Sequence, residues 1–491
     1  MIKNMLMKKT FLSLLFFILA ASAPYPSSAS GGGSGQALSG SPFDVVILNG
    51  RVMDPETSFD ETGVNVGIRG GRIIEVTKDK IRGSIEIDAT GKTVSPGFID
   101  VLSYDPNERG AWYKISDGVT TNLAMHGGAA DITAWYKRFS AARPPVNFGA
   151  AFFYLEARNS LGIRMRRAAT SIEIEKLSAM ATQALNEGAL GIGISLEYAP
   201  GISSNEVEAM ARVAKRFEAP IFFHVRYSDT EEPGTNTDAL SEVIAIAEKT
   251  GAAAHVDHIT STGGTFSMKE SLKMLEQARS RGIDITACAY PYDFWGTYLN
   301  SARFDDGWQK RFRITHKDLQ IAGTGERLTP ESFKEYRRLG KLAVAYAIPE
   351  EDVIEALRSP FVMIGSDAIL TTGNNHPRAT GAFSRTLGVY ARERGVLSLM
   401  EAIKKMTLLP AERLEKRAEL FKKKGRLRAG MDADIVVFDP DRIKDTSTVE
   451  KPASFSIGID YVLVDGKIVK TPEGLKKSIR PGKALKAVIN R

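Results

Sequence analysis

The chain has 491 residues, of which 43% are hydrophobic and 25% charged, so it has the composition of a globular protein and room for a large core with a satellite domain. The net charge of +7 is spread along the chain, and the basic cluster at 422–428 has no interleaved aromatic residues, which argues against nucleic-acid binding. One cysteine, Cys288, cannot form an internal disulfide, so stability must come from packing.

The N-terminus has the pattern of a secretory signal. Three lysines precede an apolar run at 11–21, and small residues follow it, which predicts a signal peptide at 1–23. The run is too short for a stable membrane anchor. Residues 24–42 have the Ser/Gly-rich composition of a flexible linker. We therefore expect an exported bacterial protein, periplasmic or secreted, with no membrane partner after signal cleavage.

Both ends of the remaining chain are rich in short strands. Between 43 and 94, apolar stretches alternate with Gly, Asn and Asp turns, as β-sandwich strands do. A similar pattern returns within 419–491, where 433–438 is followed by a hairpin around Asp465-Gly466. The two β-rich ends bracket a long middle segment, 95–418.

The middle segment alternates apolar runs with helical periods, which predicts βα units. The expected strands are 97–103, 119–125, 148–155, 190–196, 220–225, 252–258, 283–290 and 361–366. Eight strands are the number that a (β/α)8 TIM-like barrel needs. The long mixed segment at 294–348 lies before the last strand, where a lid over the barrel mouth could sit.

Chemically active side chains stand where the predicted strands end. His126 follows the second strand, His224 and His258 close the fifth and sixth, and Asp367 ends the eighth. Active sites of this fold gather at the carboxyl ends of the strands, so these four side chains are expected to converge. His255 should point to the other face of its strand and is expected to be structural.

Several stretches resemble the metal-dependent amidohydrolases, and more closely their N-acyl-D-amino-acid deacylase (D-aminoacylase) branch, from about 43 to 469. The first is Pro96-Gly-Phe-Ile-Asp100, which matches the first barrel strand of that superfamily. The more branch-specific stretches are Tyr290-Pro-Tyr292, His376-Pro-Arg378 and Lys405-Met-Thr407. The resemblance implies that the N- and C-terminal strands meet in one small β-sandwich beside the barrel.

The resemblance also implies roles for individual residues. Zinc would bind His224 and His258, and Asp367 would be the catalytic acid/base. Arg378, with Tyr290 or Tyr292, would hold a substrate carboxylate, and a guanidinium suits that task because it can form two parallel hydrogen bonds. Arg226, in the matching stretch His224-Val-Arg226, is a further substrate-binding candidate.

The chain departs from the family pattern at several places. Leu102 and Tyr104 replace the two histidines of strand one, which in the family hold a second, weaker metal. Gly127 stands in place of the strand-two cysteine, with His126 one residue earlier. Thr260 replaces a lysine that would contact the substrate carboxylate.

The favoured interpretation is a single-zinc hydrolase acting on the amide bond of a small carboxylate compound, such as an N-acyl-D-amino acid. Zinc would lower the pKa of a bound water toward ~7. The third ligand would be His126, Glu197 or Asp367. Two alternatives stay open at this point: an exported barrel that binds a ligand or partner without turnover, and a metal-free acid/base enzyme that uses the same pocket.

Overall fold

The computed structural model describes residues 43–232, 234–372 and 375–488. The predicted signal peptide and the linker at 24–42 lie outside the described residues, so these two interpretations stay predictions. Within the part of the chain that the structure describes, no helix combines the length and the apolar character needed to cross a membrane.

The middle of the chain forms a parallel eight-stranded barrel, and every predicted strand contributes one strand to it. The order is β16-β12-β11-β10-β9-β8-β7-β6. Just beyond the two end strands, the Asp367 backbone N–H donates to the Leu102 carbonyl at 2.7 Å, which nearly closes the barrel. The strands are β6 (Phe98–Asp100), β7 (Val119–Ala129), β8 (Asn147–Phe153), β9 (Ile192–Ser195), β10 (Ile221–His224), β11 (Ala254–Val256), β12 (Ile285–Ala289) and β16 (Val362–Ile364).

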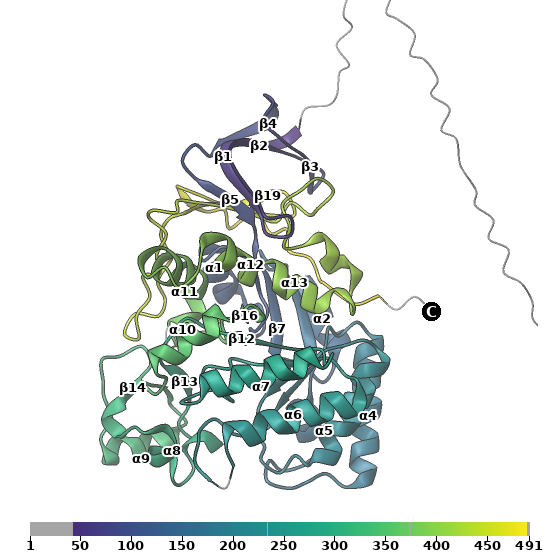
Figure 1. The fold of residues 1–491 in the computed structure, drawn as a ribbon, viewed down its shortest axis with the longest axis vertical. Coiled ribbons are helices and arrows are strands. Elements are labelled where there is room, and N and C mark those ends of the chain that lie inside the picture. Colours follow the sequence, from purple (N-terminus) through teal and green to yellow (C-terminus); the bar gives the residue numbers. More distant parts are fainter. Residues whose placement is uncertain (1–42, 233, 373–374, 489–491) are drawn as a thin grey trace, which may run out of the picture. The chain divides into compact units, whose positions relative to one another are not determined.

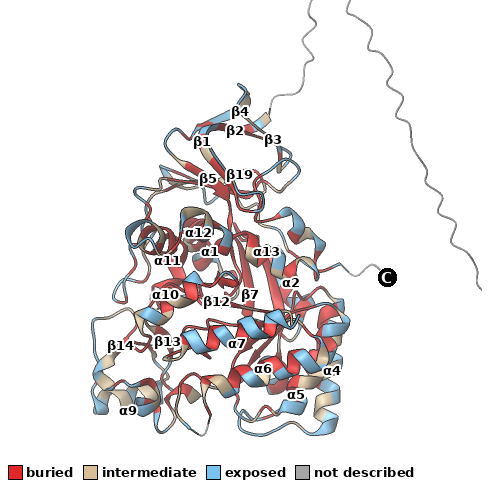
Figure 2. Ribbon diagram, in the orientation of Figure 1, coloured by how far each residue is buried: buried red, intermediate tan, exposed pale blue. Residues whose placement is uncertain are grey.

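The barrel strands are almost entirely buried, and most of them are apolar, because both of their faces are covered. Helices α5, α6 and α7 lie outside the strands (Figure 1), and they turn exposed faces to solvent while the strands are buried (Figure 2). Three of the outer helices begin with capping boxes, at Thr170, Ser203 and Thr235. The helices between barrel strands are α1 (Glu108–Ser116), α2 (Ile132–Ala142), α3 (Tyr154–Ser160), α4 (Ser171–Asn186), α5 (Ser204–Arg216), α6 (Asn236–Thr250), α7 (Met268–Ser280) and α10 (Glu350–Arg358).

After the last barrel strand the chain is helical. Helix α11 begins at Arg378, immediately after the His376-Pro377 pair, and continues into a wider π-helical segment. The elements are α11 (Arg378–Arg385), the π segment η3 (Thr386–Glu393), α12 (Leu399–Met406), α13 (Leu408–Glu415) and the 3-10 segment η4 (Glu419–Lys423).

The segment between β12 and β16 contains a small antiparallel sheet of its own, in the order β13-β15-β14. Its aromatic side chains pack in one cluster, in which Trp295 contacts Phe304 and Phe312. The elements are β13 (Trp295–Tyr298), η1 (Ala302–Phe304), α8 (Trp308–Phe312), η2 (His316–Asp318), β14 (Leu319–Ile321), α9 (Pro330–Leu339) and β15 (Leu342–Ala345). This segment is called the insertion below.

The strands near the two ends of the chain meet in one β-rich domain, as the resemblance implied. Nine strands form one continuous hydrogen-bonded sheet, joined where β5 pairs antiparallel with β17. A single apolar core lies between the N- and C-terminal strands. The strands are β1 (Phe43–Asp54), β2 (Phe59–Arg69), β3 (Arg72–Thr77), β4 (Gly83–Asp88), β5 (Thr93–Pro96), β17 (Ile435–Phe438), β18 (Ile459–Val464), β19 (Lys467–Thr471) and β20 (Gly474–Leu475).

The last described residues do not stay with the β-rich domain. Phe148, at the start of β8, donates its backbone N–H to Lys483 and accepts a hydrogen bond from Leu485 at 2.9 and 2.7 Å. Leu485 and Ala487 join the apolar cluster that includes Leu190. The C-terminal tail therefore packs against the amino ends of barrel strands, opposite to the carboxyl ends that carry the site.

Candidate metal and catalytic site

Three histidines from different strands converge at the carboxyl ends of the barrel strands. His126 lies in β7, His224 is the last residue of β10, and His258 follows β11. One ligand atom from each ring lies within 4.8 Å of the other two, and all three residues are buried. The structure thus brings together the three residues that the sequence suggested as metal ligands.

Each of these rings is held by the nitrogen that faces away from the others. His126 Nδ1 lies 3.1 Å from an Asp257 oxygen, and His224 Nε2 lies 2.8 Å from Glu197 Oε2. His258 Nδ1 lies 3.2 Å from the Thr262 hydroxyl. Metal-binding histidines are commonly held in this way, because the outer contact fixes the ring and its tautomer. His126 Nε2, His224 Nδ1 and His258 Nε2 remain for an ion, and three imidazoles are a usual ligand set for catalytic zinc.

The surroundings set the charge of these rings. Burial lowers the pKa of His224 and His258 well below the ordinary value, so both rings are neutral and able to bind a metal. Burial also acts to lower the pKa of His126, but the carboxylates of Asp367 and Asp257 outweigh it and raise that pKa. The raised pKa makes a proton a stronger competitor for a metal at His126 than at the other two rings.

An irregularity in β7 brings His126 to the site. The pairing of β7 with β8 shifts register between Ala124 and Ala129. Gly128 has a φ of +94°, and a Cβ at that position would lie 2.1 Å from the Ala151 carbonyl oxygen, so only glycine fits. The shift re-aims the strand end, and His126 occupies the place beside His224 and His258 despite its one-residue offset in the sequence.

Asp367 lies beside the three histidines with both carboxylate oxygens engaged. Its Oδ1 accepts from the Tyr104 hydroxyl at 3.1 Å, and its Oδ2 is 2.7 Å from Arg378 Nη2. Each oxygen is also 3.9 Å from one histidine nitrogen, on His126 or His258. Burial alone would raise the pKa of Asp367, but Arg378 and the histidines outweigh it, so the pKa lies below its usual value and the carboxylate is ionised.

The backbone at this end of the barrel is strained and firmly anchored. Asp367 and His258 have φ values of +50° and +29°, in a region that L-residues rarely adopt. Next to Asp367, the Ser366 N–H donates to Asp100 at 2.9 Å, and buried Lys114 donates to both Asp100 and Ser366. This network joins the end of β16 to the end of β6. It therefore fixes the backbone beside Asp367.

A cavity of about 450 Å³ opens above Asp367. Its residues come from the strand ends, the insertion and the segment before α11. They are Tyr104, His126, Phe153, Leu155, Ser195, Tyr198, Gly296, Thr297, Tyr298, Asn300, Ser301, Leu342, Asp367, Ala368, Ile369, Thr371, Asn375 and Arg378. His126, Asp367 and Arg378 line the cavity, whereas His224 and His258 do not, and much of the remaining wall is apolar.

Arg378 is the only arginine or lysine among the described residues that line the cavity. Its guanidinium lies 4.4 Å from the centre of the Tyr290 ring. One of its nitrogens binds Asp367, but the buried Nε and Nη1 have no hydrogen-bond partner among the described residues. Because buried N–H groups are costly without a partner, these two nitrogens favour a bound anion such as a carboxylate.

Three of the four predicted substrate-binding residues, Tyr290, Tyr292 and Arg226, do not line the cavity. The Tyr292 ring lies under the Arg385 guanidinium, at 4.9 Å, and its hydroxyl is close to the backbone of Gly381. Arg226 forms two hydrogen bonds with Glu242 on α6, at 2.8 and 2.7 Å, so its guanidinium is already paired. Tyr290 reaches the site only as the ring beneath Arg378.

The structure also places His255 and Glu197, two residues that the sequence analysis considered. His255 bonds to Thr286 at 2.8 Å and stacks near Phe222, away from the three converging histidines, as expected for a structural residue. Glu197, one of the three candidates for a third ligand, contacts the outer nitrogen of His224 instead.

The outer contacts of the histidines were not predicted from the sequence. Arg303 of the insertion lies 3.2 Å from Glu197 and donates to the Ser261 carbonyl at 3.1 Å. Asp257 directly precedes His258, yet its carboxylate contacts His126 instead. The adjacent Asp257-His258 pair was the available sequence signal for Asp257, whereas nothing in the sequence marks Arg303.

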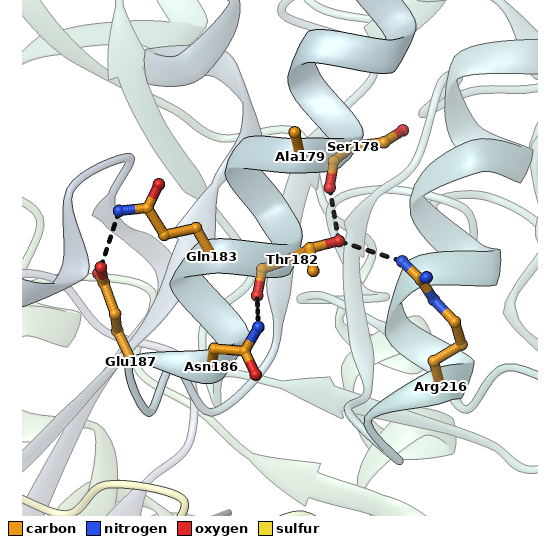
Figure 3. A pocket seen from close by; sticks show the side chains of 7 residues that line it. All are labelled: Ser178, Ala179, Thr182, Gln183, Asn186, Glu187 and Arg216. Carbon is orange, nitrogen blue, oxygen red and sulfur yellow. Dashed lines mark hydrogen bonds between the residues drawn. The ribbon is translucent and has the colours of Figure 1, made fainter.

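A larger hollow of about 650 Å³ lies on the outer helices α4 and α5 (Figure 3). Its polar side chains satisfy one another, since Arg216 donates to the Thr182 hydroxyl at 3.1 Å and Gln183 to Glu187 at 2.9 Å. It carries no histidine or cysteine and no unpartnered cation among its described residues. The chemistry of the molecule is therefore concentrated at the barrel mouth.

Comparisons with known proteins agree with this site. Residues 351–470 match the model of the amidohydrolase family. The chain is 30% identical over 483 residues to N-acyl-D-glutamate deacylase of Alcaligenes xylosoxydans xylosoxydans, which covers 90% of this chain and 96% of the relative. The chain belongs to the amidohydrolase family of enzymes, in its D-aminoacylase-like branch.

Two solved structures are similar over nearly the whole fold. One is N-acyl-D-glutamate deacylase from Bordetella bronchiseptica, complexed with zinc and a phosphonate mimic of the tetrahedral intermediate. It has a TM-score of 0.78 and 28% identity and covers 91% of this chain and 100% of that chain. The other is a D-aminoacylase studied for its binuclear metal centre, with one-metal activation and second-metal attenuation. It has a TM-score of 0.77 and 26% identity and covers 91% and 100% of the two chains.

Proposed function

We propose that this enzyme hydrolyses the amide bond of an N-acyl amino acid, with a single zinc ion held by His126, His224 and His258. The observation that carries this proposal is the convergence of three inward-facing imidazole nitrogens, two of which lie 3.1 Å apart, beside an ionised carboxylate. The relatives, which are deacylases of N-acyl-D-amino acids, support the D series as the substrate class.

The residues present suit zinc, because every ring nitrogen that does not face the shared centre already has a partner. When bound, zinc would supply Lewis-acid chemistry, polarising the substrate carbonyl and lowering the pKa of a water toward ~7. The remaining steps depend on side chains of this chain.

Asp367 is the proton carrier of the proposed reaction. It accepts a proton from the attacking water as the new C–O bond forms at the carbonyl carbon. It then hands that proton to the amide nitrogen as the C–N bond breaks, so that a carboxylic acid and a free amino acid leave. Its ionised state and its place within 4 Å of His126 and His258 fit this role.

Arg378 would hold the α-carboxylate of the substrate. Its unpartnered Nε and Nη1 lie on different edges of the guanidinium, so each provides one donor, and its contact with Asp367 places the carboxylate close to the reacting amide. The apolar part of the cavity, which includes Phe153, Leu155 and Leu342, would receive the acyl group or the amino-acid side chain.

The test is a hydrolysis assay on matched N-acetyl-D- and N-acetyl-L-amino acids, with the protein stripped of metal and then reloaded with one equivalent of zinc. We expect amino acid release from the D series that depends on zinc. Zinc binding without turnover would favour the ligand-binding barrel, and undiminished turnover by the stripped protein would favour the metal-free enzyme.

We further propose that the enzyme acts outside the cytoplasm. The basis is the signal-like pattern at 1–23 and the Ser/Gly-rich linker after it. The N-terminus of the protein recovered from the periplasm or medium of an expressing bacterium should fall near residue 24. A protein that keeps its first 23 residues and stays in the cytoplasm would contradict export.

A further inference from the structure

Asp367 is held from two opposite sides, and only one of the holders is a cation. Arg378 binds Oδ2 at 2.7 Å, whereas the neutral Tyr104 hydroxyl donates to Oδ1 at 3.1 Å. Tyr104 follows β6 and lines the cavity next to His126, and the edge of one ring faces the other at 5.7 Å between centroids. The Tyr104 side chain thus occupies the side of Asp367 that lies away from Arg378.

Gly127 makes room for this ring. A Cβ at Gly127 would lie 3.3 Å from Tyr104 Cδ1, closer than ordinary side-chain contacts. The ring of Tyr104 therefore fills the space into which a side chain at position 127 would project. A side chain at position 127 would therefore require the Tyr104 ring to shift by a few tenths of an ångström.

Leu102 completes this side of the site without offering a ligand atom. It is fully buried in an apolar cluster with Val101 and Cys288. A Cβ at Gly365 would lie 2.7 Å from its side chain, which shows how closely β16 packs on it. Within the described residues, the three histidines are the one group of metal-ligating side chains that converges closely enough for an ion.

We propose that Tyr104 replaces a second cation in this site: its ring closes the space beside Gly127, and its hydroxyl holds Asp367. This inference rests on the proposed single-zinc hydrolase and explains how Asp367 keeps its orientation there. Tyr104 is a positioning residue, because it acts through Asp367. The site therefore takes up one zinc, and excess zinc does not lower its activity.

The first experiment measures zinc binding by isothermal titration of the full mature chain, stripped of metal beforehand. We expect one zinc per chain for the wild type and for Tyr104→Phe, which keeps the ring. The double variant Leu102→His/Tyr104→His should bind a second zinc. Two zinc ions of similar affinity in the wild type would overturn the proposal, whatever the enzyme hydrolyses.

The second experiment tests the hydroxyl with the isosteric variant Tyr104→Phe, which leaves the fold and the ring packing in place. Asp367 then loses its hydrogen bond from Tyr104. Because the loss of one hydrogen bond to a charged group typically has this size, kcat should fall about tenfold while KM changes less than twofold. Unchanged kcat would overturn the role of the hydroxyl. Tyr113→Phe, on α1 and outside the cavity, is the matched control.

A spectroscopic readout separates this inference from the proposed activity. In protein loaded with cobalt instead of zinc, the visible absorption reports the surroundings of the ion even where no substrate is turned over. Tyr104→Phe should change that absorption, because Arg378 alone then holds Asp367, and Tyr113→Phe should not. Identical spectra for all three proteins would contradict the proposed role of Tyr104, whereas absent turnover with altered spectra would contradict only the proposed function.

Discussion

The site has two halves that are built in opposite ways. In the histidine half, formed by His126, His224 and His258, every ring offers one nitrogen inward and is held by a polar partner through the other. In the tyrosine half, formed by Leu102, Tyr104 and Gly127, the residues pack closely and offer no imidazole. The Tyr104 hydroxyl donates to Asp367, which lies between the two halves. The two halves thus hold Asp367 between them in different ways, one with imidazole nitrogens beside it and the other with close packing and one hydroxyl.

The largest effect is expected at Asp367, the residue that both halves contact. Asp367→Asn should lower kcat by about 10²–10⁴-fold, because an amide cannot carry the proton from water to the leaving nitrogen. The zinc content should stay near that of the wild type, since the three imidazoles are untouched. Steady-state kinetics and elemental analysis of the same preparation check both parts.

Asp306→Asn, on the exposed surface of the insertion, is the control for the Asp367 variant and should behave as the wild type. A normal kcat in Asp367→Asn would remove this carboxylate from the mechanism. It would also show that the two halves of the site do not act through Asp367.

The histidine half is broken most directly at His224. His224→Ala should weaken zinc binding by more than the ~100-fold that loss of an outer contact typically causes, because an inner ligand is removed. Competition with a zinc-binding dye gives the affinity. His316→Ala, which alters a histidine packed on Trp308 in the insertion, should bind zinc normally. Equal zinc affinity in both variants would contradict the ligand assignment.

Arg378 tests the carboxylate end of the cavity. Arg378→Lys keeps the positive charge but loses the planar fork, so kcat/KM should fall by about 10–100-fold, which corresponds to ~1.5–3 kcal/mol for hydrogen bonds to a charged group. The loss should shrink for a substrate whose carboxylate is replaced by a neutral amide. A loss of equal size for both substrates would mean that Arg378 acts on Asp367 alone.

A smaller effect is expected from the outer contact of His126. Asp257→Asn leaves an oxygen that can still accept from Nδ1 but removes the negative charge, so zinc affinity should fall by about tenfold, at the low end for such contacts. The same dye competition measures it. An affinity within twofold of the wild type would show that the charge of Asp257 does not support the histidine half.

Much of the barrel could be predicted from the sequence, because its strands are continuous apolar runs that end in polar residues. All eight strands formed within the predicted ranges or beside them, although the regular part of several is shorter, as with β6 (Phe98–Asp100) and β11 (Ala254–Val256). Strand ends such as His224 and His258 could be placed because parallel strands bring their carboxyl ends to one side.

The geometry of the rest of the site could not be predicted, because it depends on contacts between segments that are far apart in the sequence. His126 reaches the site only through the register shift in β7. Tyr104 and Asp367 are 263 positions apart in the chain, so their hydrogen bond follows from barrel closure rather than from spacing. Tyr290 and Tyr292 look equivalent in the sequence, yet only the first lies under Arg378, because the chain leaves the barrel after β12 (Ile285–Ala289).

The most direct test of the central claim is a crystal structure of the zinc-loaded protein, with anomalous diffraction recorded at the zinc absorption edge. We expect one peak, at ~2.0–2.1 Å from His126 Nε2, His224 Nδ1 and His258 Nε2, with the Tyr104 hydroxyl still hydrogen-bonded to Asp367. Two peaks on either side of Asp367, or one peak without His126 among its ligands, would contradict it.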